Sequence, residues 1–154
     1  MPQTYCLKAD IEALWTVAAV LASVDDDTSG TLSATEEGYI TRAIQRAAER
    51  MNAYLEERYV LAELATNTWC RDANAAIAAY LLSIRRGVSA PAPFQLQYDG
   101  LMSDLFEIAR GRLKVPEANE SVETIPTVSN FAIDLTGGSD KVLRVAETST
   151  GSPP

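Results

Sequence analysis

The stretch Ser33–Tyr59, SATEEGYITRAIQRAAERMNAYLEERY, decides the fold of this chain. Ser33 and Glu36 have the spacing of a capping box, in which two side chains satisfy free N–H groups at the start of a helix. Apolar residues then recur three or four positions apart, which places them on one helical face: Ile40, Ala43, Ile44, Ala47, Met51, Tyr54 and Leu55. The pattern predicts a long helix that runs to about Arg58 and buries one face against other elements.

Three further helices are predicted to cover that face. The first follows Asp10, a residue suited to cap a helix, and continues to the acidic loop that precedes Ser33. The next spans about Arg71–Arg86 and ends at Gly87, and the last spans about Gln95–Arg110 and ends at Gly111, because glycine readily adopts the conformation that closes a helix. The apolar stripe of the first helix consists of Ile11, Leu14, Trp15, Ala18 and Leu21. The expected fold is mainly α, a small bundle of about four helices over residues 1–115.

Residues 116–154 are predicted to form an extended C-terminal arm. From Pro116 onward Ser, Thr, Glu and Pro dominate and the helical periodicity ends. Large apolar residues alternate with smaller or polar ones and then form a second β-prone run, so the arm is expected to form a β-hairpin or to add a strand to another subunit. The expected interface residues are Phe131, Ile133, Leu135, Val142, Leu143 and Val145. The alternative is a disordered tail whose β-propensity arises by chance.

Charge argues against a protein that grips DNA. The formal net charge of the 154 residues is -8, and the acids concentrate toward both ends of the chain. Tight DNA binding requires clustered Lys and Arg that neutralise phosphates, and this balance has the opposite sign. An acidic surface can still serve beside DNA, because it repels the backbone and lets DNA pass without sticking.

The residue types present also argue against an enzyme. The chain has no histidine, which removes Ser-His-Asp and Cys-His catalysis and most zinc or haem ligation. Cys6 and Cys70 lie far apart in sequence and outside any CxxC spacing, so they are expected to be reduced packing residues. No secretory leader or membrane-length apolar run is visible, and we expect a soluble protein that is not secreted.

The loop Asp25–Glu36 has the residue pattern of one EF-hand calcium loop. Oxygen-bearing side chains stand at loop positions one, three, five, nine and twelve, and Gly30 stands at the sharp turn in position six. The expected ligands, which suit Ca²⁺ better than Mg²⁺, are Asp25, Asp27 and Ser29, the carbonyl of Thr31, Ser33 directly or through water, and Glu36. The alternative without metal is a tight turn followed by the capping box. Signalling EF-hands come in pairs and no second loop exists here, so a bound ion would be structural and would fix the angle between two helices.

The order of these residues resembles that of the small head-tail connector proteins of tailed bacteriophages, also called adaptor or neck-ring proteins. The resemblance covers about residues 5–115 and is carried by spaced packing residues. They are Tyr5-Cys6 and Asp10-Ile11, the acidic loop, Ala43, Ala47, Met51, Tyr54-Leu55 and Arg58-Tyr59 in the long helix, Ala76 and Ala79-Tyr80-Leu81 in the third, and Tyr98, Leu105, Ile108-Ala109 and Gly111 in the fourth.

The resemblance implies a helical subunit of a ring, expected to be a dodecamer, made in the host cytoplasm and located in the neck of the virion. Its implied partners are the portal protein and a downstream neck or tail protein, and DNA passes through the ring without sequence-specific binding. Two features depart from the family pattern: Tyr59 is followed by Val60-Leu61 instead of a Leu-Pro pair, and the arm is longer than in minimal members.

Two other function classes stay open on the sequence. The first alternative is a small soluble calcium-binding protein with a single EF-hand at Asp25–Glu36. The second is an acidic cytoplasmic regulator that binds one protein partner through its arm.

Overall fold

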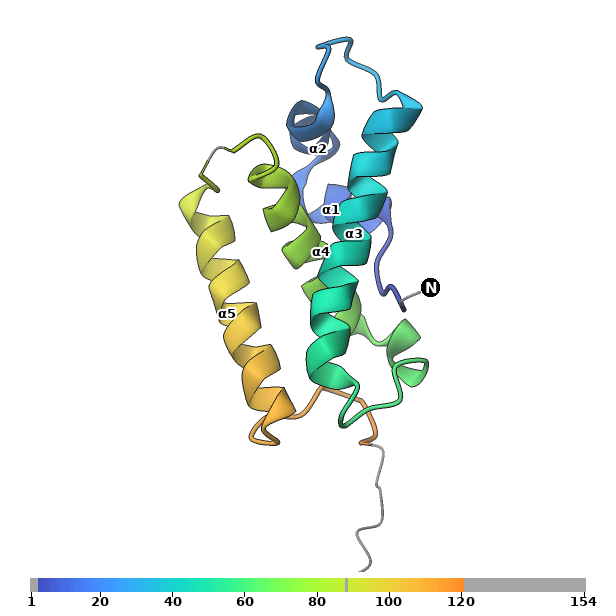
Figure 1. The fold of residues 1–154 in the computed structure, drawn as a ribbon, viewed down its shortest axis with the longest axis vertical. Coiled ribbons are helices and arrows are strands. Elements are labelled where there is room, and N and C mark those ends of the chain that lie inside the picture. Colours follow the sequence, from blue (N-terminus) through green and yellow to red (C-terminus); the bar gives the residue numbers. More distant parts are fainter. Residues whose placement is uncertain (1–2, 88, 121–154) are drawn as a thin grey trace, which may run out of the picture. The chain divides into compact units, whose positions relative to one another are not determined.

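A computed structural model describes residues 3–87 and 89–120, and these residues are mainly helical (Figure 1). The predicted interface residues of the arm, from Phe131 to Val145, lie outside the described residues. No strand occurs within residues 3–87 and 89–120. The helices are α1 (Lys8–Trp15), α2 (Val17–Val24), α3 (Ala34–Leu55), the 3-10 helix η1 (Glu63–Thr66), α4 (Thr68–Ser83) and α5 (Ala92–Ala109).

The long helix α3 begins as the sequence predicts. Ser33 is its N-cap: the Ser33 side chain accepts a hydrogen bond from the Glu36 N–H, and the Glu36 carboxylate accepts one from the Ser33 N–H. The helix ends at Leu55, three residues before the predicted end, and a turn brings Tyr59 back to the core, where it is buried. The apolar face of α3 packs along α4.

The prediction of one continuous first helix is wrong, because Thr16 separates α1 from α2. Thr16 has a φ of 80° and a ψ of 145°, and it closes α1 and opens α2 with its own hydrogen bonds. Its N–H donates to the Glu12 carbonyl at 2.9 Å, and its side chain accepts from the Ala19 N–H at 3.3 Å. The break resets the helical phase, so Val20 is buried in place of the predicted Ala18, which is exposed. Asp10 also lies in the first turn of α1, where its carboxylate accepts from the Leu7 N–H at 2.7 Å, and is not the N-cap.

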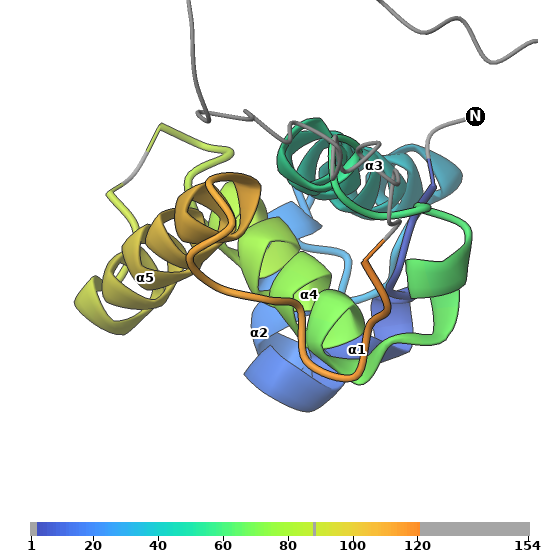
Figure 2. The same cartoon turned by 90° about the horizontal axis from the view of Figure 1, so that it is seen from below.

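Helix α4 forms the centre of the packing. Viewed from below, α3 lies on one side of α4, α1 and α2 lie on the other, and α5 flanks it (Figure 2). Small side chains allow this close approach from several directions. The buried alanines of α4 are Ala73, Ala75, Ala76, Ala78 and Ala79.

A buried asparagine on α4 ties the N-terminal segment to the core. Asn74 is 0 % exposed, and its side-chain oxygen accepts hydrogen bonds from the N–H groups of Tyr5 (3.3 Å) and Cys6 (3.1 Å). Its side-chain nitrogen donates to the Ile44 carbonyl on α3 at 3.3 Å. Asn74 therefore joins three segments that are distant in the sequence.

The boundaries of α4 and α5 agree only in part with the predicted ones, and the differences have local causes. Helix α4 begins three residues before the predicted start, because Asn67 caps it by accepting from the Cys70 N–H at 3.0 Å. Helix α5 begins at Ala92 because a proline in the first helical turn needs no N–H partner. The predicted terminator Gly111, with a φ of 75°, directly follows the C-cap of α5. Helix α4 ends at Ser83, three residues before the predicted end at Arg86, and Gly87, with a φ of 73°, closes the turn that follows it.

Residues 115–120 lie against the helical bundle. Val115 is buried, and its N–H donates to the Tyr59 hydroxyl at 3.0 Å. Asn67 donates to the Pro116 carbonyl at 2.7 Å, and Arg58 forms an ion pair with Glu120 at 2.6 Å. The chain therefore leaves the described residues beside the C-terminal end of α3.

Cys6 and Cys70 are both buried and both free thiols. Burial raises the pKa of each thiol to about 12. A thiolate is the reactive form of cysteine, so these side chains act as apolar packing groups. No helix among residues 3–87 and 89–120 is long and apolar enough to cross a membrane.

Candidate functional site

The acidic loop links α2 to α3 and folds around its first carboxylate. Asp25 is buried, and its two oxygens accept from the N–H groups of Ser29 (3.1 Å) and Gly30 (2.9 Å). The Asp27 carboxylate accepts from the same Ser29 N–H at 3.0 Å. Gly30 has a φ of 75°, a conformation that glycine adopts without steric cost, and this turns the chain back toward α3.

Glu36 closes the loop from the other side. It is only 4 % exposed, and one of its oxygens accepts from the Asp26 N–H at 2.7 Å. The other accepts from the Ser33 N–H at 2.8 Å and the Ser33 hydroxyl at 2.7 Å. These hydrogen bonds, led by the one from the Ser33 backbone, hold the pKa of the Glu36 carboxyl below its usual range.

Three of the predicted calcium ligands come together in the structure. One carboxylate oxygen each from Asp25, Asp27 and Glu36 lies within 4.8 Å of the others. Hydrogen bonds from the Ser29 side chain and backbone hold the pKa of the Asp27 carboxyl below its usual range, so this side chain is ionised near neutral pH.

The other predicted ligands, Ser29, Thr31 and Ser33, are engaged with protein groups. The Ser29 hydroxyl donates to the Thr31 carbonyl at 2.9 Å, and Ser33 is bonded to Glu36. The loop therefore has both features that the sequence suggests, a concentration of carboxylate oxygens and a capping box.

Arg85 and Arg86, which follow the C-terminal end of α4, form an arginine clamp on the loop that no sequence motif indicates. Both guanidinium groups reach Asp26: Arg85 donates to one of its oxygens at 3.1 Å, and Arg86 to the other at 3.0 Å. Arg85 also donates to the carbonyls of Ser23 and Val24 at the end of α2, and its guanidinium lies 4.4 Å from the centre of the Tyr39 ring on α3.

Hydrogen bonds from Arg85, together with its charge and that of Arg86, hold the pKa of the Asp26 carboxyl below its usual range. The clamp thus fastens α2, α3 and α4 to one another beside the loop. The two arginines are about sixty positions from Asp26 in sequence, and no local pattern indicates such a pairing.

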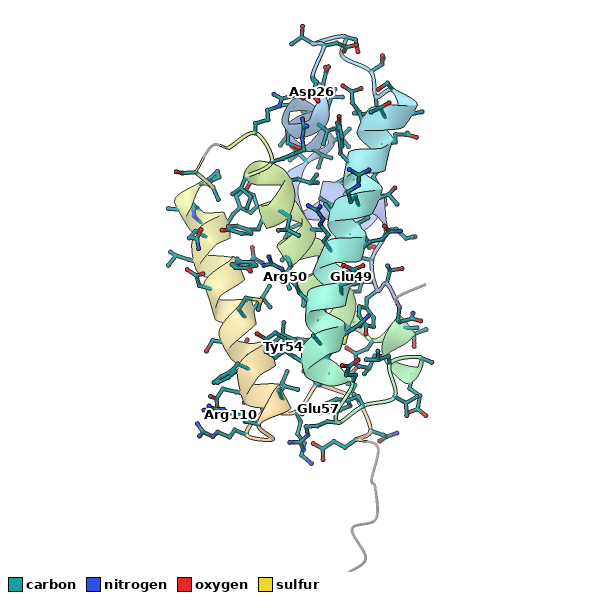
Figure 3. The ribbon with its side chains drawn as sticks, in the orientation of Figure 1. Asp26, Glu49, Arg50, Tyr54, Glu57 and Arg110 are labelled. Carbon is teal, nitrogen blue, oxygen red and sulfur yellow. The ribbon has the colours of Figure 1, made fainter. Side chains whose placement is uncertain are left out.

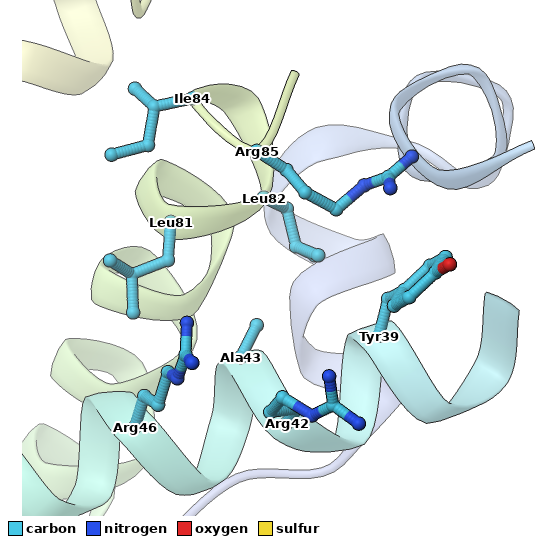
Figure 4. A pocket seen from close by; sticks show the side chains of 8 residues that line it. All are labelled: Tyr39, Arg42, Ala43, Arg46, Leu81, Leu82, Ile84 and Arg85. Carbon is cyan, nitrogen blue, oxygen red and sulfur yellow. The ribbon is translucent and has the colours of Figure 1, made fainter. Parts of the chain in front are cut away.

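A groove lies beside this clamp, between α3 and the C-terminal end of α4 (Figure 4). It encloses about 360 Å³. Its lining residues are Tyr39, Arg42, Ala43, Arg46, Leu81, Leu82, Ile84 and Arg85. The surface thus combines an apolar floor with cationic edges.

A protein-family model described as Bacteriophage Mu, Gp36 matches residues 5–132, more than four fifths of the chain. The chain belongs to the bacteriophage Mu Gp36 family. It is therefore a phage protein. No match to the chain was found among curated proteins.

The family match places the acidic loop, the clamp and the groove inside the Gp36-family region, and it extends beyond the described residues into the arm. Of the predicted interface residues of this Gp36-family protein, Phe131 lies within the match. Ile133, Leu135 and the run from Val142 to Val145 lie beyond its end at residue 132.

Helix α3 carries three arginines at intervals of four positions, Arg42, Arg46 and Arg50, and their surroundings differ. Arg50, labelled on α3 in Figure 3, donates to the Tyr98 hydroxyl on α5 and lies 5.9 Å from the centre of that ring. The Tyr98 ring in turn stacks on Tyr80, with 4.1 Å between the ring centres. Arg42 and Arg46 are exposed and make no hydrogen bond or ion pair with any residue of the described chain. In this Gp36-family protein Arg50 thus packs against α5, whereas Arg42 and Arg46 remain available at the groove.

Proposed function

We propose that the protein is a structural subunit of a phage head-tail connector, a ring that joins the portal to tail components and surrounds the path of the DNA. The observation that carries the proposal is the Gp36-family match over residues 5–132, which gives a phage context to a chain that resembles connector proteins. In this proposal the subunits form a closed ring, a dodecamer as the resemblance implies, in the virion neck.

Exposed apolar side chains at the start of α1 and beside the break between α1 and α2 support a role in an assembly. Leu7, Leu14 and Val17 are 73 %, 45 % and 61 % exposed. Burying a side chain of this size stabilises an interface by about 1.5–3 kcal/mol. These residues are suited to a contact between neighbouring subunits, because such a contact removes them from water.

Net charge supports a channel role. The chain has 21 acidic and 13 basic residues. An acidic wall repels the phosphate backbone, so DNA can move through the ring without being held.

Electron microscopy of the full chain, alone and mixed with the portal protein of the same phage, tests the proposal. Rings that stack on the portal are expected. Leu14→Asp combined with Val17→Asp should abolish the rings without lowering helicity, whereas Val60→Asp, at an exposed apolar residue on another loop, should leave them intact. A protein that stays monomeric in the presence of portal would show the proposal to be wrong.

Calcium binding at the acidic loop is a second candidate function, favoured by the approach of Asp25, Asp27 and Glu36 oxygens within 4.8 Å. A bound Ca²⁺ would neutralise adjacent carboxylates and strengthen the link between α2 and α3. Calorimetric titration should give a single site that is lost in Asp25→Asn and Glu36→Gln and retained in Asp104→Asn, an exposed position on α5. Absence of heat and of a thermal shift at about 10 mM Ca²⁺, above the weakest EF-hand range, would exclude the site.

A further inference from the structure

The groove between α3 and α4 has the chemistry of a docking surface for an extended, acidic and apolar segment. Its floor consists of Ala43, Leu81, Leu82 and Ile84, and Leu81 and Ile84 are partly exposed. In Figure 4, Arg42 and Arg46 rise from α3 on one side of the hollow, and the leucines and Ile84 of α4 lie opposite.

The cations at the groove are not equivalent. Arg85 is engaged by Asp26 and Tyr39, as described above. Arg42 and Arg46 have no hydrogen-bonding or ionic partner in the described residues. Two positive charges therefore border an apolar floor, and their N–H donors are available to an acceptor.

The hollow continues along α3. A second depression of about 450 Å³ shares Arg46 and Leu81 with the first and extends to Ala53. From Tyr39 to Ala53 the helix rises about 21 Å, at 1.5 Å per residue. A segment of seven or eight extended residues spans the same length from its first to its last residue, at about 3.3 Å per step.

The arm of this chain contains one segment that matches in length, apolar pattern and charge. Residues 128–135, VSNFAIDL, alternate so that Phe131, Ile133 and Leu135 share one face of an extended chain. Asp134 lies on the opposite face, and residues 121–140 contain three acids and no Lys or Arg. The segment can thus set its apolar side chains on the floor, and its acidic face remains open to the long side chains of Arg42 and Arg46 at the edge of the groove.

Backbone pairing to the helical bundle is not available to this segment, because residues 3–87 and 89–120 contain no strand whose edge could accept another. A groove that receives side chains is the alternative mode of peptide recognition. Glu120, the last described residue, is tied to Arg58 beside the C-terminal end of α3, whereas the groove begins at Tyr39, near the N-terminal end of that helix.

We propose that the groove along α3 binds residues 128–135 of a neighbouring copy of this chain. This inference rests on the proposed function, in which copies lie side by side in a ring. It assigns the arm a specific receiving surface and gives Arg42 and Arg46 a role in holding it.

Cysteine cross-linking between full-length chains tests the inference. Arg46→Cys protein is mixed with Ile133→Cys protein under assembly conditions and oxidised, and the product is run on a non-reducing gel. The native thiols do not compete, because Cys6 and Cys70 are buried. A disulfide-linked heterodimer is expected in at least tenfold excess over the control mixture of Ala65→Cys, an exposed residue of η1, with Ile133→Cys.

Other outcomes of the cross-linking separate this inference from the proposed function. Rings without the heterodimer would overturn the groove assignment and leave the connector role in place. A link that forms within one chain of the double variant, and never between chains, would show that the arm binds its own subunit. Absence of both rings and heterodimer would contradict both proposals.

Charge exchange supplies an independent readout that does not need cysteines. Arg42→Glu with Arg46→Glu should reduce ring yield at least fivefold while circular dichroism stays unchanged, because both residues are exposed. Adding Asp134→Lys to that variant should restore most of the yield. Failure of the exchange to restore rings, with the helical fold intact, would contradict pairing between the groove and the arm.

Discussion

Replacing Asn74 with alanine is expected to destabilise the helical bundle strongly. The side chain is fully buried and makes three hydrogen bonds, two from the N–H groups of Tyr5 and Cys6 and one to the Ile44 carbonyl. Alanine removes these partners and leaves two buried donors unsatisfied. The N-terminal segment then loses its link to α4.

The size of the effect follows from the two orphaned donors. A buried donor without a partner costs about 1–3 kcal/mol, so the loss of unfolding free energy should be about 2–6 kcal/mol. A domain of this size is stabilised by about 5–15 kcal/mol in total. At about 4 °C per kcal/mol, the corresponding fall in the melting temperature is about 8–24 °C.

Urea denaturation followed by circular dichroism measures this change directly. Asn119→Ala is the matched control, because Asn119 is exposed, and its effect should stay within about 0.5 kcal/mol. An Asn74→Ala protein as stable as the control would refute the assignment of Asn74 as the link between the N-terminal segment and the core.

Glu36→Gln should make the free energy of unfolding depend less steeply on pH in the acid range. The pKa of Glu36 is lower in the folded protein, so unfolded chains bind the proton first and stability is lost as pH falls from about 5 through the folded pKa. Urea midpoints measured between pH 7 and 3 should fall less steeply in Glu36→Gln than in wild type or in Glu56→Gln, an exposed position. Gly30→Ala should destabilise by about 1 kcal/mol, because φ is 75° there, whereas Gly100→Ala, at an exposed position of α5 with open space around an added Cβ, should stabilise by up to about 1 kcal/mol. Thermal melts of the two variants that shift in the same direction would contradict this reasoning.

The helical architecture could be predicted because its signals are local. The Ser33 and Glu36 capping box and the apolar stripe that follows gave the start and the buried face of α3. Gly111 gave the end of α5, whereas Gly87 closes the turn after α4, which ends at Ser83.

The break at Thr16 could not be predicted from the same signals. A threonine at a φ of 80° is unfavourable by itself, and no glycine or proline marks the position. The break is stabilised by hydrogen bonds on both sides and by burial of Val20 and Val24, and these depend on the tertiary packing.

In the candidate site, too, contacts within one short segment could be predicted from the sequence, and contacts between distant segments could not. Spacing alone indicated that Asp25, Asp27 and Glu36 would meet. The contacts of Asp26 with Arg85 and Arg86 depend on how two segments distant in the sequence pack together. No periodicity or motif in the sequence indicates that packing. The groove likewise exists only once α3 and α4 lie together.

A phage that lacks this gene provides the most direct test of the connector role. Electron microscopy of the lysate should show heads without tails together with free tails, and expression of the wild-type chain should restore joined particles. Fully joined, DNA-filled particles in the absence of the protein would contradict the account.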